Sequence, residues 1–411
     1  MFILQTIGVL DTANVSYAAL TMAGNLQFTA TTFGIGAGIF FIGYLLFQLP
    51  VSVLAENRSA RKCISIVVAS SGAVAMGTAL INNDWQFYIM RFALGACAAG
   101  LFPALVVYSS HWFGARQRGL VYSVLIAAFA VSQIIAGPVS TQILSNNWIG
   151  IQGWRWMFIL EGLPALLMAP VAYKVLSDRP GSAEWLTPSE RRSVEGRLAA
   201  EHKLKSSAAA HTWKIAIRER EVLTLAAIYG LWLAANYGLL FFLPTMVGEI
   251  TALPLTSIGL ILAAISTAAF IALILFGKLS DRSRDKKLLA LVPLVIGAAA
   301  LIVCTLTHQN ATVSIVLLGV TVVGFGSAFG VFWTLPTLFL SETSAAVSIG
   351  LIGAIGNLGG FIGPSVSGYL RSSTGAFTSS NILFVVLAVS AALLILTLKK
   401  TRVPSIESIH G

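Results

Sequence analysis

Long apolar stretches, separated by short polar loops, recur along almost the whole chain. A helix needs about 20 apolar residues to cross the hydrocarbon core of a bilayer, and twelve stretches approach this length. The expected spans lie near residues 2–23, 32–54, 63–81, 85–110, 119–143, 156–177, 221–247, 255–277, 288–307, 312–340, 345–370 and 378–399. The pattern predicts an all-α integral membrane protein with twelve transmembrane helices.

Basic residues give these spans an orientation. They concentrate in alternate loops, whereas the opposite loops hold little beyond Arg155 and Arg371. Because basic loops remain on the cytoplasmic side, both termini of this multi-pass protein are predicted to be cytoplasmic. The net charge of +10 then reflects topology, and nucleic-acid binding is not expected.

The only sizeable polar stretch, residues 178–220, separates the first six spans from the last six. Within it, Thr187 is expected to cap a short helix, with Pro188 as its first residue and Glu190 completing a capping box. The predicted domains are an amino-terminal six-helix bundle (1–177), a cytoplasmic linker (178–220), and a carboxy-terminal six-helix bundle with a cytoplasmic tail (221–411).

The two halves repeat each other. "ENRSARK" follows the second span and "SDRSRDKK" follows the eighth, which places Arg58 and Arg282 224 residues apart. Pro138 and Pro364, each in a Gly-Pro pair, are 226 residues apart. Nearly equal displacements indicate a duplicated six-helix unit, and parallel repeats of this kind build one class of transporter with its site between the halves.

Composition supports this class and argues against an enzyme. Hydrophobic residues make up 56% of the chain and charged residues only 10%, against about 25% charged in soluble domains. The sequence has no nucleophile elbow, phosphate-binding loop or metal-ligand spacing, and Cys63, Cys97 and Cys304 are isolated from one another. No cofactor or metal is therefore expected.

Several motifs resemble those of the major facilitator superfamily, and more specifically its anion:cation symporter family of tartrate, phthalate and sugar-acid permeases. They include "FGIGAGIFFIGYLLFQLP", "GWRWMFILEGLPALL", "SDRPGSAEWLTPSERR" and "IGNLGGFIGP". The resemblance implies two six-helix bundles, alternating access, and uptake of small organic anions with protons. It also implies a conformational motif in the cytoplasmic loops, formed by Gly277, Asp281 and Arg282 and, in the first half, by Arg58 and Arg61.

The chain departs from the family pattern where substrate and protons are handled. The first span reads Asp11-Thr12-Ala13-Asn14, although the family has arginine at the second position. Ala98 replaces a glutamate seven residues after Arg91, and Gly353 replaces an asparagine. In the family that arginine typically contacts the substrate carboxylate and that glutamate carries a coupling proton. The substrate pocket thus has one cation and one acid fewer than the family pattern. This favours a monoanionic substrate or weaker coupling to protons. The chain also begins a turn or two into the family's first span, so a shortened amino terminus is expected.

Asp11 and Arg91 are both predicted to lie within the membrane. Each charge would cost roughly 2.5–3.5 kcal/mol there, so a partner or water is required. We expect both to face one central cavity, where Arg91 binds the substrate and Asp11 is the proton-coupling residue. The alternative is a static ion pair that locks two helices. Glu161, near the outer end of the sixth span, is expected to be structural.

Further residues are expected to contribute to the substrate site. Tyr44 and Gln48 lie one turn apart in the second span, with snorkelling or helix packing as the alternative, and Asn14 lies one turn beyond Asp11 on the same face. The others lie in spans that line the cavities of the resembling family, with interhelical packing as the alternative. They are Gln133, Asn236, Tyr237, Trp333 and Asn357.

The function predicted from the sequence is secondary active transport, in which a monomer in the lipid bilayer carries a small organic anion together with a proton. Two alternatives remain open: an uncoupled facilitator of a small organic acid, and a transporter-derived sensor that does not transport. Which organic anion is carried stays undetermined.

Overall fold

The computed structural model describes residues 1–205, 219–283, 285–307, 310–336 and 342–398, and these ranges contain helices and no strand. The first half contains α1 (Phe2–Leu26), α2 (Ala30–Asn57), α3 (Ala60–Gly77), α4 (Asp84–Ala98), α5 (Leu101–Ser110), α6 (Ala115–Leu144) and α7 (Gly153–Val175). The second half contains α10 (Arg220–Thr251), α11 (Leu255–Arg282), α12 (Lys286–Leu306), α13 (Ala311–Phe332), α15 (Glu342–Thr374) and α16 (Thr378–Thr397). The linker carries α8 (Pro188–Lys205).

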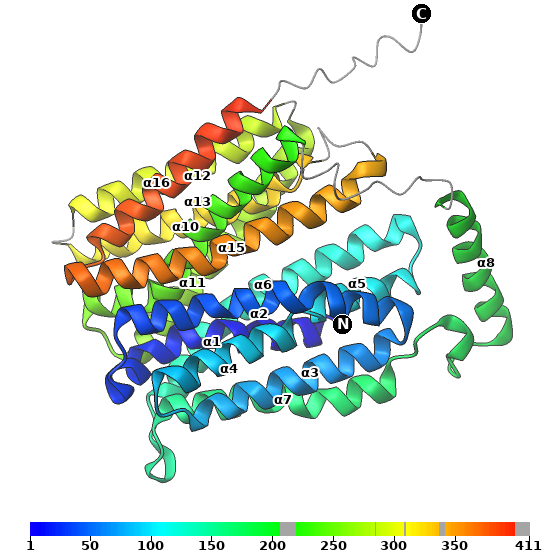
Figure 1. Ribbon diagram of the computed structural model, residues 1–411, viewed down its shortest axis with the longest axis horizontal. Helices are drawn as coiled ribbons and strands as arrows, with labels where there is room; N and C mark the ends of the chain where they lie inside the picture. Colours follow the sequence, from blue (N-terminus) through cyan, green and yellow to red (C-terminus); the bar gives the residue numbers. More distant parts are fainter. Residues whose placement is uncertain (206–218, 284, 308–309, 337–341, 399–411) are drawn as a thin grey trace, which may run out of the picture.

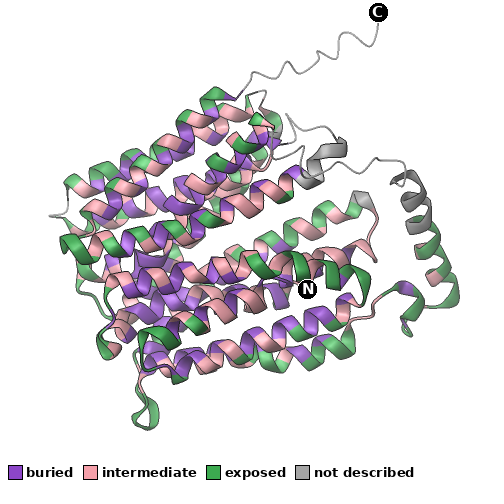
Figure 2. Ribbon diagram, in the orientation of Figure 1, coloured by how far each residue is buried: buried purple, intermediate pink, exposed green. Residues whose placement is uncertain are grey.

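The helices form two bundles that lie side by side, α1–α7 in one and α10–α16 in the other (Figure 1). The predicted fold class is confirmed. Figure 2 shows buried residues where helices face one another and exposed residues on the outer faces. Many of these outward residues are large and apolar, as a bilayer requires. Examples are Leu49, Ile66, Leu260 and Leu393.

Eleven helices in the described ranges are long and apolar enough to cross a membrane, and α1 is not one of them. It is nevertheless a helix of 25 residues in the place predicted for the first span. The polar residues Gln5, Asp11 and Asn14 interrupt its apolar run and explain why it is less apolar than the other spans. All three are nevertheless buried. Since α1 packs on α6, α7 and α10, these polar side chains are shielded from lipid.

The fourth predicted span consists of two consecutive helices, α4 and α5, interrupted at Ala99 and Gly100. Pro103 explains the interruption. Its nitrogen has no hydrogen to donate to the carbonyl of Ala99, and its ring would clash with that carbonyl in a regular helix. The two helices together still form one membrane span, Asp84–Ser110.

The linker helix has the predicted amino-terminal cap. The backbone N–H of Thr187 donates to Glu190 Oε2 at 2.9 Å, and the N–H of Glu190 donates to Thr187 Oγ1 at 3.4 Å. The hydrogen bond from the backbone of Thr187, together with that from its hydroxyl, lowers the pKa of Glu190. Trp185, just before this helix, stacks on Trp112 with the ring centroids 5.4 Å apart, which holds the linker against the end of the first bundle.

The two bundles meet at glycines in α2 and α15. A Cβ atom at Gly34 would lie 2.3 Å from the carbonyl oxygen of Pro364, and one at Gly368 would lie 2.2 Å from that of Ala30. The N–H of Thr31 also donates to Ser372 Oγ at 2.9 Å. All these residues lie in the halves of α2 and α15 away from the basic loops. We call this half of the molecule the far side and the half with the basic loops the basic side.

A second glycine contact joins the bundles through α6 and α11, also on the far side. A Cβ atom at Gly137 would lie 2.4 Å from the carbonyl oxygen of Gly259, and one at Gly259 would lie 2.0 Å from Thr141 Oγ1. Only glycine permits backbones to approach this closely. The far side is therefore closed by two helix pairs in direct backbone contact.

Candidate functional site

Arg91 of α4 is a buried cation with unused donors. Its side chain is 1% exposed, and its Nε–H donates to the carbonyl of Gly36 in α2 at 3.3 Å. The guanidinium carbon lies 5.1 Å from the ring centroid of Phe40. Nη1 and Nη2 are buried and have no hydrogen-bond partner in the described part of the chain. Four of the five N–H groups of the guanidinium are thus free to bind an anion.

Asp11 and Arg91 are not paired, so the static ion pair considered from the sequence does not form. Both carboxyl oxygens of Asp11 are buried without a hydrogen-bond partner among the described residues. Among the described residues, the charged group that acts on Asp11 is Glu161, and none acts on Arg91. The contacts also give no support to the expected chamber shared by Asp11 and Arg91.

Asp11 instead belongs to a buried acidic cluster formed by three helices. Asp11 and Asn14 lie one turn apart on α1, and Glu161 of α7 is 2% exposed. Glu161 Oε1 accepts a hydrogen bond of 2.7 Å from the hydroxyl of Ser140 in α6. Asn14 lies close enough to interact with Glu161, but neither its amide atoms nor Glu161 Oε2 has a partner at ordinary hydrogen-bond geometry. The sequence analysis does not place Glu161 near Asp11; the available signal is an acid within an otherwise apolar span.

A tyrosine cluster lies where the bundles meet. It is formed by Tyr44 of α2 and by Tyr229 and Tyr237 of α10, which interact electrostatically with one another. Tyr237 packs on Phe41 with ring centroids 4.6 Å apart. Tyr44 packs on Phe40 at 6.0 Å, and Phe40 is the ring beside the Arg91 guanidinium. The structure therefore brings together two predicted site residues, Tyr44 and Tyr237, and the ring of Phe40 connects Tyr44 to Arg91.

Tyr229 is the cluster member that the sequence did not reveal. It stacks on Trp232 and meets the predicted residue Trp333 edge to face, with centroids 5.1 Å apart. A Cβ atom at Gly356 of α15 would lie 2.1 Å from the Tyr229 ring. The available signal was its position eight residues before Tyr237, about two helical turns along the same face of α10.

The other predicted substrate residues are half-buried: Gln48, Gln133, Asn236 and Asn357. In the described ranges none of them forms a hydrogen bond with Arg91, with the acidic cluster or with the tyrosine cluster. Their part in substrate binding stays a prediction.

The first-half loop motif is anchored by an aspartate. The hydroxyl of Ser59 lies 2.9 and 2.8 Å from the two carboxyl oxygens of Asp178, and the N–H of Arg61 donates to the same group at 3.0 Å. The Arg61 guanidinium lies 4.2 Å from the ring centroid of Tyr173 in α7. Arg58 is exposed at the end of α2. These contacts fasten the start of α3 to the segment after α7.

The second-half motif lies in the last turns of α11. A Cβ atom at Gly277 would meet no other atom within 4 Å, and Arg282 is exposed. The side chain of Asp281 lies outside the described residues. The conformational role of this motif stays a prediction.

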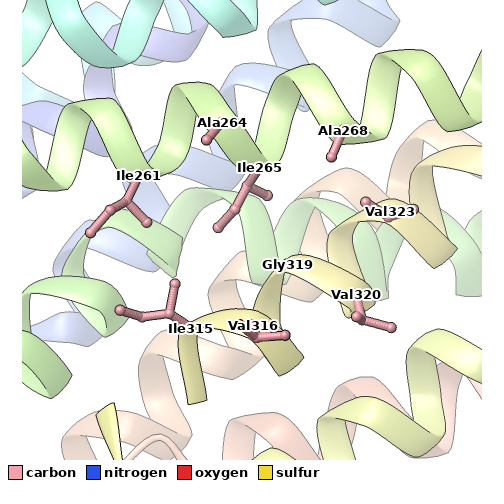
Figure 3. A pocket seen from close by; sticks show the side chains of 9 residues that line it. All are labelled: Ile261, Ala264, Ile265, Ala268, Ile315, Val316, Gly319, Val320 and Val323. Carbon is pink, nitrogen blue, oxygen red and sulfur yellow. The ribbon is translucent and has the colours of Figure 1, made fainter. Parts of the chain in front are cut away.

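A separate groove of about 470 Å³ runs between α11 and α13 (Figure 3). Its lining is apolar and includes Ile261, Ile265, Ile315 and Val320. Without a charged or hydrogen-bonding side chain it does not suit a small polar solute, and it lies away from Arg91 and the tyrosine cluster.

Comparison with known proteins identifies the family. The sequence profile described as "Major Facilitator Superfamily" matches residues 1–364. The chain belongs to the major facilitator superfamily. Two proteins of Agrobacterium vitis, each named "Putative tartrate transporter", are 35% and 34% identical to it. The alignments cover 99% and 98% of this chain and 90% and 92% of the two relatives.

The fold of this major facilitator protein also matches a solved structure. A bacterial homologue of the human lysosomal transporter Spinster, in an inward-facing and occupied conformation, superimposes with a TM-score of 0.79 at 15% identity. The match covers 96% of this chain and 94% of that one. The protein is a multi-pass membrane transporter and not an enzyme.

Proposed function

We propose that this transporter carries a small organic carboxylate into the cell together with a proton, by alternating access between its two bundles. The observation that carries the proposal is Arg91, a buried cation whose terminal nitrogens have no partner in the described residues. A charge within a membrane is costly unless it is paired. A substrate carboxylate supplies the missing charge and accepts two parallel N–H bonds from the guanidinium.

The tyrosine cluster supplies the rest of the substrate site. It combines three hydroxyl groups with aromatic faces, and Phe40 links it to Arg91. Hydroxyls bind the polar groups of a small acid, whereas the faces of Tyr229 and Trp333 pack against its carbon skeleton. Tyr44 and Tyr237 come from different bundles, so a substrate held here contacts both.

The site has one cation where the resembling family has two. Thr12 replaces the arginine that the resembling family has next to the aspartate of the first span. The Thr12 hydroxyl donates to the carbonyl of Gly8 in the same helix at 3.2 Å. A single guanidinium balances one carboxylate. The site therefore favours a monoanion, or a dicarboxylic acid with one carboxyl group protonated. The names of the two Agrobacterium relatives support a small organic acid as the substrate.

The arrangement corresponds to one of two states in the proposed cycle. The glycine contacts between α2 and α15 and between α6 and α11 close the far side. With the basic loops in the cytoplasm, as the sequence predicts, this state is closed to the outside. Substrate entry then requires the contact between Gly34 and Gly368 to separate. The protein would work as a monomer in a bacterial inner membrane, with both termini cytoplasmic.

Asp11 is the residue that we assign to the proton. It is the buried carboxyl group of α1, and α1 contacts both its own bundle and α10 of the other. Neutralising Asp11 by protonation lowers the cost of keeping α1 inside the membrane.

Uptake of labelled organic acids by proteoliposomes tests the proposal, with tartrate, sugar acids and aromatic acids as the panel and with and without an imposed pH gradient. Arg91→Gln is expected to lower uptake about 10- to 150-fold, since hydrogen bonds to a charged group contribute roughly 1.5–3 kcal/mol. Arg197→Gln, in the exposed face of α8, is the matched control and should leave uptake unchanged.

The proton is tested separately. Asp11→Asn is expected to abolish accumulation driven by the pH gradient. Wild-type uptake that is the same with and without the pH gradient would favour the uncoupled facilitator. Substrate binding without counterflow of labelled substrate would favour the sensor.

A further inference from the structure

Glu161 is a second buried acid, and the substrate site does not use it. It lies on α7, and its carboxyl group and that of Asp11 act on each other electrostatically. Both residues are at most 2% exposed. Three of their four carboxyl oxygens have no hydrogen-bond partner in the described part of the chain. The fourth, Glu161 Oε1, accepts from Ser140.

No cation in the described part of the chain compensates the two acids. Among the described residues, the polar and ionisable groups that act on the pair are Asn14, Tyr17 and Ser140, all of them neutral. Arg91, the buried cation of the same bundle, acts on neither. Two carboxylates that share a site away from water cannot both remain ionised. Such pairs hold a proton between them.

The unpaired amide of Asn14 is a second observation that supports a proton site in this cluster. It is completely buried, lies one turn from Asp11 and interacts with Glu161. Its amide oxygen and nitrogen both lack a partner among the described residues, which is costly in an apolar interior. An amide can donate to an ionised carboxyl group and accept from a protonated one, so Asn14 can serve the pair in either protonation state.

We propose that Asp11 and Glu161 share one proton and form the coupling site as a pair, which extends the proposed function from one residue to two. In the loaded state the proton is bonded to one carboxyl oxygen and the other carboxylate is charged. On release the O–H bond breaks, the proton passes to water, and both groups are charged. The repulsion between α1 and α7 then favours the state in which water reaches the pair.

The position of α1 links this change of charge to the transport cycle. This helix packs on α6 and α7 of its own bundle and on α10 of the other. Tyr229 and Tyr237 of the substrate site belong to α10. A shift of α1 relative to α7 therefore changes the packing of α1 on α10, where the two bundles meet.

Two substitutions of Glu161 separate the charge of this residue from its hydrogen bond. Glu161→Gln removes the charge and keeps an oxygen that can accept from Ser140. Glu161→Asp keeps the charge, but its shorter side chain weakens the contact with Ser140. Both are measured as the pH dependence of substrate uptake in proteoliposomes, with Asp11→Asn alongside.

If the pair shares a proton, the pH midpoint of uptake should move about one unit or more to lower pH in Glu161→Gln, because the remaining acid no longer has a charged neighbour. Glu161→Asp should stay close to wild type. The opposite pattern, a normal profile in Glu161→Gln and a shifted one in Glu161→Asp, would show that Glu161 only anchors helices and would overturn the proposal.

Infrared spectroscopy of the purified protein provides a readout that does not depend on transport. The wild type should show a band of a protonated carboxyl group that titrates with pH and is absent from the double variant Asp11→Asn/Glu161→Gln. If the band remains in the double variant, the pair does not hold the proton. Uptake that follows a sodium gradient instead of pH would also overturn the pair as a proton site. Failure of the wild type to transport any organic acid, with the band intact, would count against the proposed function alone.

Discussion

The close contact between α2 and α15 yields a quantitative prediction about Gly34. A Cβ atom at this position would lie 2.3 Å from the carbonyl oxygen of Pro364 and 3.1 Å from Gly368 Cα. The first distance is about 1.1 Å shorter than the 3.4 Å at which ordinary contact begins. Both obstacles are backbone atoms, which cannot rotate away as a side chain can. Gly34→Ala can be accommodated only if α2 and α15 separate.

Forcing extra carbon into a packed contact costs roughly 1–3 kcal/mol. The cost applies to the state in which the far side is closed, because α2 and α15 touch there. The equilibrium should therefore shift about 5- to 150-fold toward the state with an open far side. Gly34→Val should shift it further, since its side chain is larger.

Thiol labelling measures this shift. Ser365 lies beside Gly38 at the same interface and its hydroxyl oxygen is buried, so Ser365→Cys places a shielded thiol there. In a background without the native cysteines, Gly34→Ala should raise the labelling rate of this thiol by a membrane-impermeant maleimide and slow substrate uptake.

Gly350→Ala is the control, because Gly350 lies on α15 like Ser365 and a Cβ atom there meets nothing within 4 Å. It should change neither rate. A labelling rate that stays at the wild-type value in both Gly34→Ala and Gly34→Val would refute the reasoning. An equal rise in the control would refute it as well.

Two further predictions concern the basic side. Asp178→Ala removes the acceptor for Ser59 and Arg61, and should destabilise the protein by about 1–3 kcal/mol, seen as a lower Tm in detergent. Asp178→Asn retains an acceptor oxygen, so its Tm should fall less than that of Asp178→Ala. An equal fall in Tm for both variants would contradict the role of these hydrogen bonds. Thr187→Ala removes the cap of α8, at a cost of about 0.5–2 kcal/mol to the helix, and should speed limited proteolysis of the linker without changing uptake. Thr187→Ser keeps the cap and should be cleaved like wild type, and unchanged cleavage of Thr187→Ala would rule out the cap as a stabilising element.

Much of the architecture could be read from local sequence. Helix-length apolar runs determine the number and placement of the spans because a bilayer admits only segments that satisfy their own backbone hydrogen bonds. The cap at Thr187 and Glu190 was equally predictable, since a capping box involves residues three apart. The break at Ala99 and Gly100 was not predicted, although Pro103 signals it.

The partners of the buried charges were decided by tertiary structure alone. Sequence placed Asp11 and Arg91 at membrane depth, but whether two side chains meet depends on how each helix is rotated and on what packs between them. Gly95 lets α4 approach α2 so closely that Arg91 lies against Gly36 and Phe40.

Asp11 instead lies close enough to Glu161 of α7 for the two carboxyl groups to interact electrostatically. The tyrosine cluster arises in the same way, from Tyr44 of one bundle and two residues of α10 in the other. The chain by itself therefore determined which residues lie within the membrane, because that depends on local hydropathy. Only the packing of helices distant in sequence decided which of them touch, because side-chain contacts depend on helix rotation and on close approach at glycines.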